Sequence, residues 1–141
     1  MKYLIVTINS FRFALEISKV FEIIIPGVGG NTAPEKMLCD KSMIYQDKNI
    51  PILFVADSLF NIPSNKPENF RIILCEINNT QFGLLVDNAN EIVSVSKEDI
   101  CPVKKYPREI ETDILDGEFN DDDNDIYILT PDKILTATKT V

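Results

Sequence analysis

Few side chains in this sequence could carry out chemistry. The chain has no histidine, the residue that most often serves as a general base or a metal ligand. Asp87 draws attention because it ends the apolar run 83–86, but no second acid stands at a fixed spacing from it. No glycine-rich phosphate loop is present either. We therefore predict that Asp87 shapes a turn through its side chain, and that the protein is not an enzyme and uses no cofactor.

Three cysteines could bind a metal or form a disulfide. Cys39, Cys75 and Cys101 are odd in number and widely spaced, and they form no CxxC pair. This spacing is typical of reduced structural thiols and not of a disulfide framework or a zinc site. We predict that they are buried.

The net charge of −8 is concentrated in one segment. Residues 109–125 (EIETDILDGEFNDDDND) contain no basic residue, whereas residues 1–108 contain equal numbers of acids and bases. The run DDDND (121–125) could suggest a calcium-binding EF-hand loop, which needs Gly at its sixth position and Glu at its twelfth. Counted from Asp121, these positions hold Ile126 and Asp132, so we predict a solvated hairpin loop at 121–125 and no metal. The charge pattern also provides no basic surface for nucleic acid.

Short strands must position whatever site exists. In 11–17 (FRFALEI) apolar residues alternate with others, which indicates a half-buried strand. Asn9–Ser10 joins it to the apolar run 3–8 and predicts a hairpin. A second copy of INSFRFALEISKVFEII (8–24) occurs 69 residues later as INNTQFGLLVDNANEIV (77–93). The repeat favours two small β-rich subdomains.

The length of 141 residues suits one domain. No apolar run approaches the roughly 20 residues that cross a bilayer, so no membrane insertion is expected. The N-terminus reads as a first strand and not as a signal peptide. We expect a cytoplasmic protein.

With the strands placed, the chain resembles the CheW family, the coupling proteins of bacterial chemosensory arrays. The order and spacing of four segments over about 3–136 carry this resemblance: YLIVTINSFRFALEISKVFEII, IPILFV, FGLLVDNANEIVSVSKEDICP and DIYILTPDKIL. It implies an all-β fold with few short helical turns, made of two five-stranded β-barrels side by side. A single domain over 1–141 would then contain subdomains at roughly 15–69 and 70–130, with the terminal segments crossing between them.

The resemblance implies a non-enzymatic adaptor that couples a histidine kinase to chemoreceptors in chemotaxis. Exposed strands of the first barrel would pack against the CheA-like regulatory domain of the kinase, and the groove between barrels would take the receptor's cytoplasmic tip. Two alternatives stay open. The first is a divergent adaptor of a non-chemotaxis signalling system, and the second is a small barrel that binds a ligand in its mouth.

Eight residues are candidates for kinase or receptor binding. Val20, Glu22, Ala89 and Ile92 occupy positions that the resemblance marks as partner-facing, although half-buried strand surface would produce the same pattern. Gly83 interrupts a strand, which indicates either close packing or the approach of a partner backbone.

The three remaining candidates mark a departure from the family. Its members carry an Asn-x-Arg-Gly turn before the proline-containing strand, but here the Arg and Gly positions are Gln46 and Asp47, and a usual Gly falls on Lys41. Losing an Arg removes a fixed charge with a five-donor fork. We predict that kinase binding survives while receptor coupling is altered.

Overall fold

The computed structural model describes residues 1–8, 10–25, 38–39, 42–54, 70–104, 115–121 and 124–134. Short strands account for most of them. The strands are β1 (Lys2–Ile8), β2 (Phe11–Glu16), β3 (Val20–Ile24), β4 (Leu38–Cys39), β5 (Ser42–Tyr45), β6 (Lys48–Phe54), β7 (Arg71–Ile77), β8 (Thr80–Val86), β9 (Asn88–Ser94), β10 (Leu115–Asp121) and β11 (Asn124–Leu129). Two single 3₁₀ turns, η1 (Ile17–Lys19) and η2 (Lys97–Asp99), and a helical turn at 131–134 complete them. The all-β prediction is confirmed.

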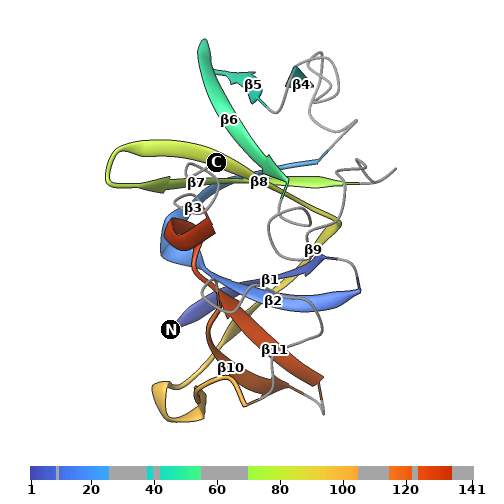
Figure 1. Ribbon diagram of the computed structural model, residues 1–141, viewed down its shortest axis with the longest axis vertical. Helices are drawn as coiled ribbons and strands as arrows, with labels where there is room; N and C mark the ends of the chain where they lie inside the picture. Colours follow the sequence, from blue (N-terminus) through green and yellow to red (C-terminus); the bar gives the residue numbers. More distant parts are fainter. Residues whose placement is uncertain are drawn as a thin grey trace.

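The strands form two sheets, one above the other in Figure 1. The first sheet has the order β10-β11-β2-β1-β9 and lies in the lower half of that view. The second sheet has the order β3-β7-β8-β6-β5-β4 and lies in the upper half. Within the described residues neither sheet is closed by pairing of its end strands, so the prediction of two five-stranded barrels is wrong in this detail. The sheets are open and have five and six strands.

β1 and β2 pair as the predicted hairpin, although Asn9 of the joint lies outside the described residues. Two-residue turns close two further hairpins. Asn78 and Asn79 join β7 to β8, and both have positive φ, 50° and 65°. Gln46 and Asp47 join β5 to β6 with φ of 49° and 62°. Positive φ at both central residues defines the type I′ turn, whose twist matches that of the flanking strands.

The sequence repeat has a structural counterpart. A shift of 69 residues carries β1 onto β7 and places β2 and β3 on β8 and β9. The pairing registers correspond as well, since Leu4 faces Ile92 between β1 and β9 while Ile73 faces Ile23 between β7 and β3. Both pairs contain a bulge at the same place, one residue before the glutamate at 22 or 91. A shift of 76 relates the β5–β6 hairpin to the β10–β11 hairpin.

The two copies exchange strands. β3 follows β2 in the chain but pairs with β7, and β9 follows β8 but pairs with β1. Each sheet therefore contains one hairpin from one copy and three equivalent strands from the other, and the second sheet has β4 in addition. The subdomain ranges 15–69 and 70–130 stay a prediction, but strands from both ranges hydrogen bond within the second sheet.

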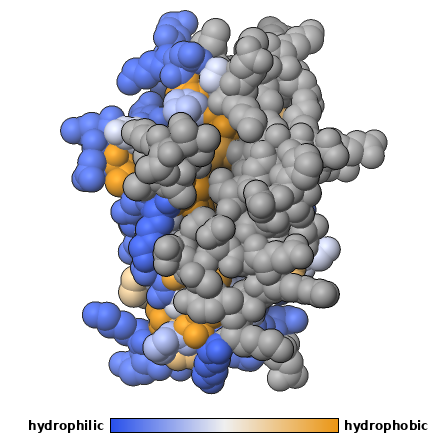
Figure 2. Space-filling view, in the orientation of Figure 1, coloured by the Kyte–Doolittle hydropathy of each residue, from blue (hydrophilic) through white to orange (hydrophobic). Residues whose placement is uncertain are grey.

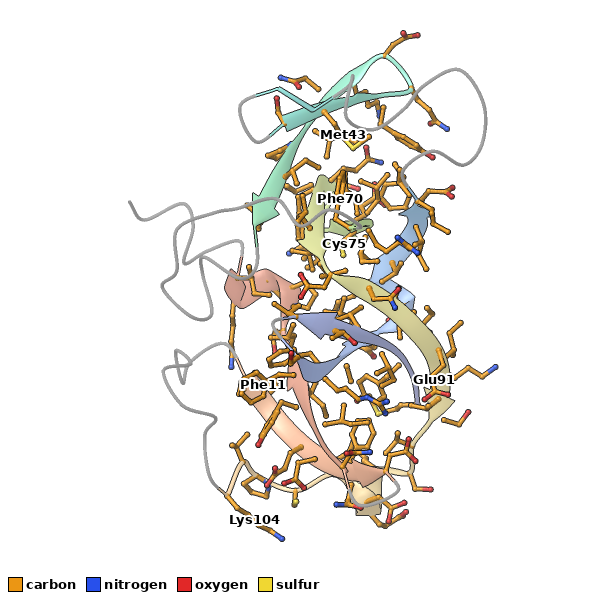
Figure 3. The ribbon with its side chains drawn as sticks, turned by 90° about the vertical axis from the view of Figure 1, so that its right-hand side faces the viewer. Phe11, Met43, Phe70, Cys75, Glu91 and Lys104 are labelled. Carbon is orange, nitrogen blue, oxygen red and sulfur yellow. The ribbon has the colours of Figure 1, made fainter. Side chains whose placement is uncertain are left out.

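A central core holds the two sheets together. It gathers the inward residues of β1–β2 and of β7–β8, and Phe13 and Phe82, equivalent in the repeat, are both 0% exposed there. The outer face of each sheet has a smaller core of its own. That of the first sheet includes Tyr3, Ile5, Ala14, Phe119 and Ile126, and that of the second includes Met43, Ile50, Phe70, Ile72 and Leu74. In Figure 3 Met43 and Phe70 lie in the outer core of the second sheet, with Cys75 below them on the side of the first.

The cysteine prediction is confirmed for Cys75. It is 0% exposed in the central core, and burial raises the pKa of its thiol to about 12, although the Lys19 charge acts in the opposite direction. Cys101 is partly exposed and pairs with Glu118 through backbone hydrogen bonds in both directions. The side chain of Cys39 lies outside the described part of the chain.

Strand β10 is a correction to the sequence analysis. Residues 115–121 lie within the acidic segment 109–125, for which no strand was predicted. The solvated hairpin loop was predicted only for 121–125, and there Asp121 pairs with Asn124 where β10 meets β11. Leu115, Gly117 and Phe119 face inward, while Asp116 and Asn120 are exposed. Glu118 is buried beside a bulge, where its carboxylate accepts the backbone N–H of Lys104 at 2.9 Å. Acidic side chains at the outward positions concealed the alternation.

The end of the described chain is tied to the first strands. The helical turn at 131–134 begins at Pro131, and the Thr130 carbonyl accepts the N–H groups of Lys133 and Ile134. Ile134 is buried in the central core, and the Lys19 ammonium lies 3.2 Å from the Asp132 carboxylate. No helix of the described residues is long and apolar enough to cross a membrane.

Truncation of either central phenylalanine tests the core. We expect Phe13→Ala and Phe82→Ala each to lower the free energy of unfolding by about 3–5 kcal/mol, because each leaves a cavity between the sheets. Phe11→Ala, at a partly buried position of the same hairpin, should cost less. Urea melts provide the measurement. A loss below roughly 1 kcal/mol at Phe13 or Phe82 would contradict the central core.

Candidate partner-binding surface

Strand β3 lies at the edge of the second sheet and carries two of the candidate residues. Val20 is partly buried and packs against the central core, whereas Glu22 is exposed. The bulge between them breaks the alternation of the strand, so that Phe21 and Glu22 are both exposed. Phe21 is 40% exposed and Ile25, just beyond the strand, is 37% exposed. Glu22 and the two apolar side chains make this edge a surface suited to a protein partner.

The Gln46–Asp47 turn meets this edge strand through Tyr45. The Tyr45 hydroxyl donates a hydrogen bond to the Glu22 carboxylate at 3.4 Å, and its ring lies 6.2 Å from the Phe21 ring. β3 and β5 are not neighbours in the sheet, so the contact is made across the curl of the sheet. We call Phe21, Glu22, Tyr45, Gln46 and Asp47 the β3–turn surface. The side chains of Gln46 and Asp47 are both exposed.

The environment of Tyr45 favours its neutral form. Partial burial raises the pKa of its phenol, and the Glu22 charge and the hydrogen bond from the hydroxyl raise it further. The phenol therefore donates to Glu22 at neutral pH, and the turn is held against β3. Asp47 and Glu22 make the surface acidic, with no basic side chain among its five residues.

The other two strand candidates lie elsewhere. Ala89 and Ile92 belong to β9, at the edge of the first sheet. Ala89, equivalent to Val20 in the repeat, is partly buried against the central core. Ile92 is 58% exposed and Glu91 beside it is exposed, pointing away from the ribbon in Figure 3. The structure thus separates the candidates into two edge strands on different sheets, and their role in binding stays a prediction.

Gly83 is buried within β8, where there is no space for a side chain. An added Cβ would lie 2.5 Å from the Ile52 side chain and 2.9 Å from that of Ile72. This contact supports the packing interpretation of Gly83. The equivalent position in the first sheet is Ala14, which is also 0% exposed. Gly83 is not part of the exposed surface.

Two predicted residues remain. Lys41 lies outside the described residues. Asp87 lies between β8 and β9, and its backbone N–H donates to the Thr7 carbonyl of β1 at 2.9 Å. Among the described residues no group of three or more acids and cysteines is close enough to hold a metal.

Sequence reasoning missed Phe21 and Tyr45. Both belong to apolar runs that were read as simple strands. The β-bulge that exposes Phe21 cannot be recognised from the residue types of that strand. Tyr45 directly precedes the Gln46–Asp47 turn, and this position was the one feature of the sequence that could have pointed to it. Figure 2 shows the face of the molecule seen in Figure 1. The described residues on this face are largely hydrophilic, with hydrophobic side chains visible between them.

Comparison with known proteins adds a family. A family model described as a CheW-like domain matches residues 2–139. Among solved structures, the chain is similar to the scaffolding protein TtCheW from Thermoanaerobacter tengcongensis, with a TM-score of 0.72 and 25% sequence identity over 92% of this chain and 88% of that one. No curated protein matches at a significant level.

Substitution of Gly83 tests the packing interpretation. Gly83→Ala should lower the free energy of unfolding by about 1–3 kcal/mol, as overpacking of a core does. Partner affinity of the folded fraction should be unchanged. Chemical denaturation measures the first quantity and titration the second. A variant as stable as the wild type that loses a partner would instead place Gly83 in a contact.

Titration of Tyr45 tests the contact across the sheet. Glu22→Gln removes the charge and should lower the Tyr45 pKa towards its ordinary value of 10.0. Because the pKa of Tyr45 is raised in the folded state, the hydrogen bond of the neutral phenol contributes fully to stability below pH about 10. This contribution is lost as the pH rises through the folded-state pKa. The chemical shift of the Tyr45 ring, assigned with Tyr45→Phe, follows the titration. Glu76→Gln is the control, and an equal effect of both variants would refute the contact.

Proposed function

Because the chain belongs to the CheW-like domain family, we propose that it is a non-enzymatic adaptor that couples a histidine kinase to chemoreceptors in chemotaxis-type signal transduction. The match of the family model to residues 2–139 carries this proposal. The similarity to a scaffolding protein supports it. The sequence has no histidine and no catalytic spacing, in keeping with a protein that acts by binding. The family membership supports a location in the cytoplasm.

We assign kinase binding to the edge of the second sheet. The exposed Phe21 and Ile25 supply apolar area at the end of the sheet, where β3 pairs with one neighbouring strand, β7, among the described residues. A CheA-like regulatory domain, which the family resemblance implies to be homologous, would pack its own strands here. Specific interfaces bury about 1,200–2,000 Å² in total, and transient ones less. Residues beyond the two apolar side chains must therefore take part.

We assign receptor specificity to the Gln46–Asp47 turn. The turn is exposed and lies against β3 through the Tyr45–Glu22 hydrogen bond. Asp47 and Glu22 are both exposed and give this surface two negative charges, so it would repel an acidic receptor surface. Like charges across an interface cost several kcal/mol. The turn therefore acts against receptors that other members bind through arginine.

A divergent adaptor of a non-chemotaxis system is the second candidate function. The observation that favours it is the same turn, because the family's Arg and Gly are absent while the strands are kept. The two candidates share the kinase and differ in the receptor, so measured affinities for both partners separate them.

The test compares the wild type with Gln46→Arg/Asp47→Gly. Each is titrated against a kinase regulatory domain and a receptor-tip fragment of the same organism by calorimetry. We expect equal kinase affinity and a receptor affinity at least about tenfold higher for the variant, a gain of about 1.4 kcal/mol. Asn78→Arg/Asn79→Gly, in the matched turn between β7 and β8, is the control for added charge.

Two results would contradict the proposal. Absence of kinase binding by the wild type would remove the adaptor function. Equal receptor affinity of the wild type and the variant would show that the turn does not contact the receptor.

A further inference from the structure

A cavity lies at the open side of the first sheet. It has a volume of about 230 Å³ and lies between the ends of β9 and β10, the two edge strands of that sheet. Its described lining residues are Val93, Ser94, Val95, Asp99, Phe119, Asn120 and Asp121. Drug-sized ligands occupy cavities of about 300–1,000 Å³. The space therefore suits one long side chain and not a whole cofactor.

The sequence repeat shows why the cavity is open here. In the second sheet, Tyr45 and Ile24 occupy the equivalent positions and pack against the outer core, and the Tyr45 ring contacts that of Phe21 on the edge strand β3. The first sheet has Asp121 in place of Tyr45 and Val93 in place of Ile24. Ser94 replaces Ile25 as well. The polar replacements leave space where the other sheet has an intramolecular aromatic contact.

The lining combines apolar and acidic groups. Phe119 and Val95 are 4% and 8% exposed, so they form the buried part of the cavity. Asp99, from η2, and Asp121, from β10, add two carboxylates, and no basic residue is among the described lining residues. Neither carboxylate makes an ion pair with a basic side chain in the described ranges. The Asn120 amide is turned towards the Asp125 carboxylate at 3.3 Å, which adds a third acid nearby.

These groups match the parts of an arginine side chain. Its aliphatic stem suits the valine and phenylalanine surface, and its guanidinium stacks on aromatic rings. The planar fork bonds carboxylates in pairs, and it loses less hydration than an ammonium when it leaves water. A neutral aromatic group, the counterpart of Tyr45, would leave Asp99 and Asp121 desolvated without a partner.

We propose that this cavity binds an arginine side chain presented by a protein partner at the open edge of the first sheet. The site is separate from the β3–turn surface, since it lies on the other sheet. The identification of the occupant as part of a protein rests on the proposed adaptor function. The recognition of a guanidinium rests on the cavity alone.

The first experiment uses Nα-acetyl-arginine methylamide as the probe, titrated into the full chain and followed by amide chemical shifts. We expect saturable shifts at residues 93–95, 99 and 119–121, with a dissociation constant of about 1–10 mM. Asp99→Asn/Asp121→Asn should weaken binding at least tenfold. Glu91→Gln/Glu98→Gln, which removes two exposed charges outside the cavity, is the matched control and should have little effect.

Two further probes make the test selective. The citrulline derivative, a neutral isostere of arginine, should produce no saturable shifts, and the lysine derivative should bind more weakly than arginine. Equal binding of citrulline or lysine, or equal binding by Asp99→Asn/Asp121→Asn and the wild type, would overturn the proposal.

The second experiment measures binding of a kinase regulatory domain to the same variants. Weakening by Asp99→Asn/Asp121→Asn and not by the control pair would identify the kinase as the source of the arginine. Wild type that binds the kinase but not the arginine probe would refute the cavity proposal and leave the adaptor function intact. Wild type that binds the probe but not the kinase would support the cavity site and remove the adaptor function.

Discussion

The packing of two equivalent hairpins against each other is the constraint on which the structure depends. β1–β2 and β7–β8 place Phe13 and Phe82 in one core, and each hairpin takes its remaining sheet neighbours from the other copy. Neither copy could bury its hairpin alone, because the apolar faces are complementary only across the centre. The outer cores then fill according to the same registers, and bulges occur at equivalent places in both sheets.

The duplicated sheets differ in the two surfaces that we propose as binding sites. In the second sheet an aromatic side chain reaches across to the edge strand and donates to a carboxylate. In the first sheet the corresponding residue is itself a carboxylate and leaves a cavity. One scaffold thus presents two acidic surfaces of different shape: an exposed apolar edge beside a turn, and a recess. Duplication allows the two to diverge because the central core does not depend on either.

Alternation and the repeat were enough to predict the strands of both hairpins. The family was predicted from the resemblance of four segments, and the reduced thiol of Cys75 from the number and spacing of the cysteines. Strand β10 was missed, because acidic residues at its outward positions resemble a solvated loop when Leu115, Gly117 and Phe119 are not recognised as its inner face. The pairing of β3 with β7 could not be predicted, because period-two patterns define faces and not neighbours. For the same reason Tyr45 and Phe21 escaped notice. Their contact depends on the curl of a sheet, whereas Val20 and Glu22 were identified through the family resemblance.

The exchanged topology also has a consequence for the order of synthesis. All strands of the second sheet have left the ribosome once residue 86 has emerged, whereas β1 and β2 need partners from 88–129. The first hairpin to be made is therefore the last to be incorporated into a complete sheet. Until then its inner face can bury itself only against β7–β8. Pairings of such long sequence separation form slowly, and exposed apolar hairpins are where nascent chains need protection. The two sheets are alike when folded, yet the second can be completed earlier in translation than the first.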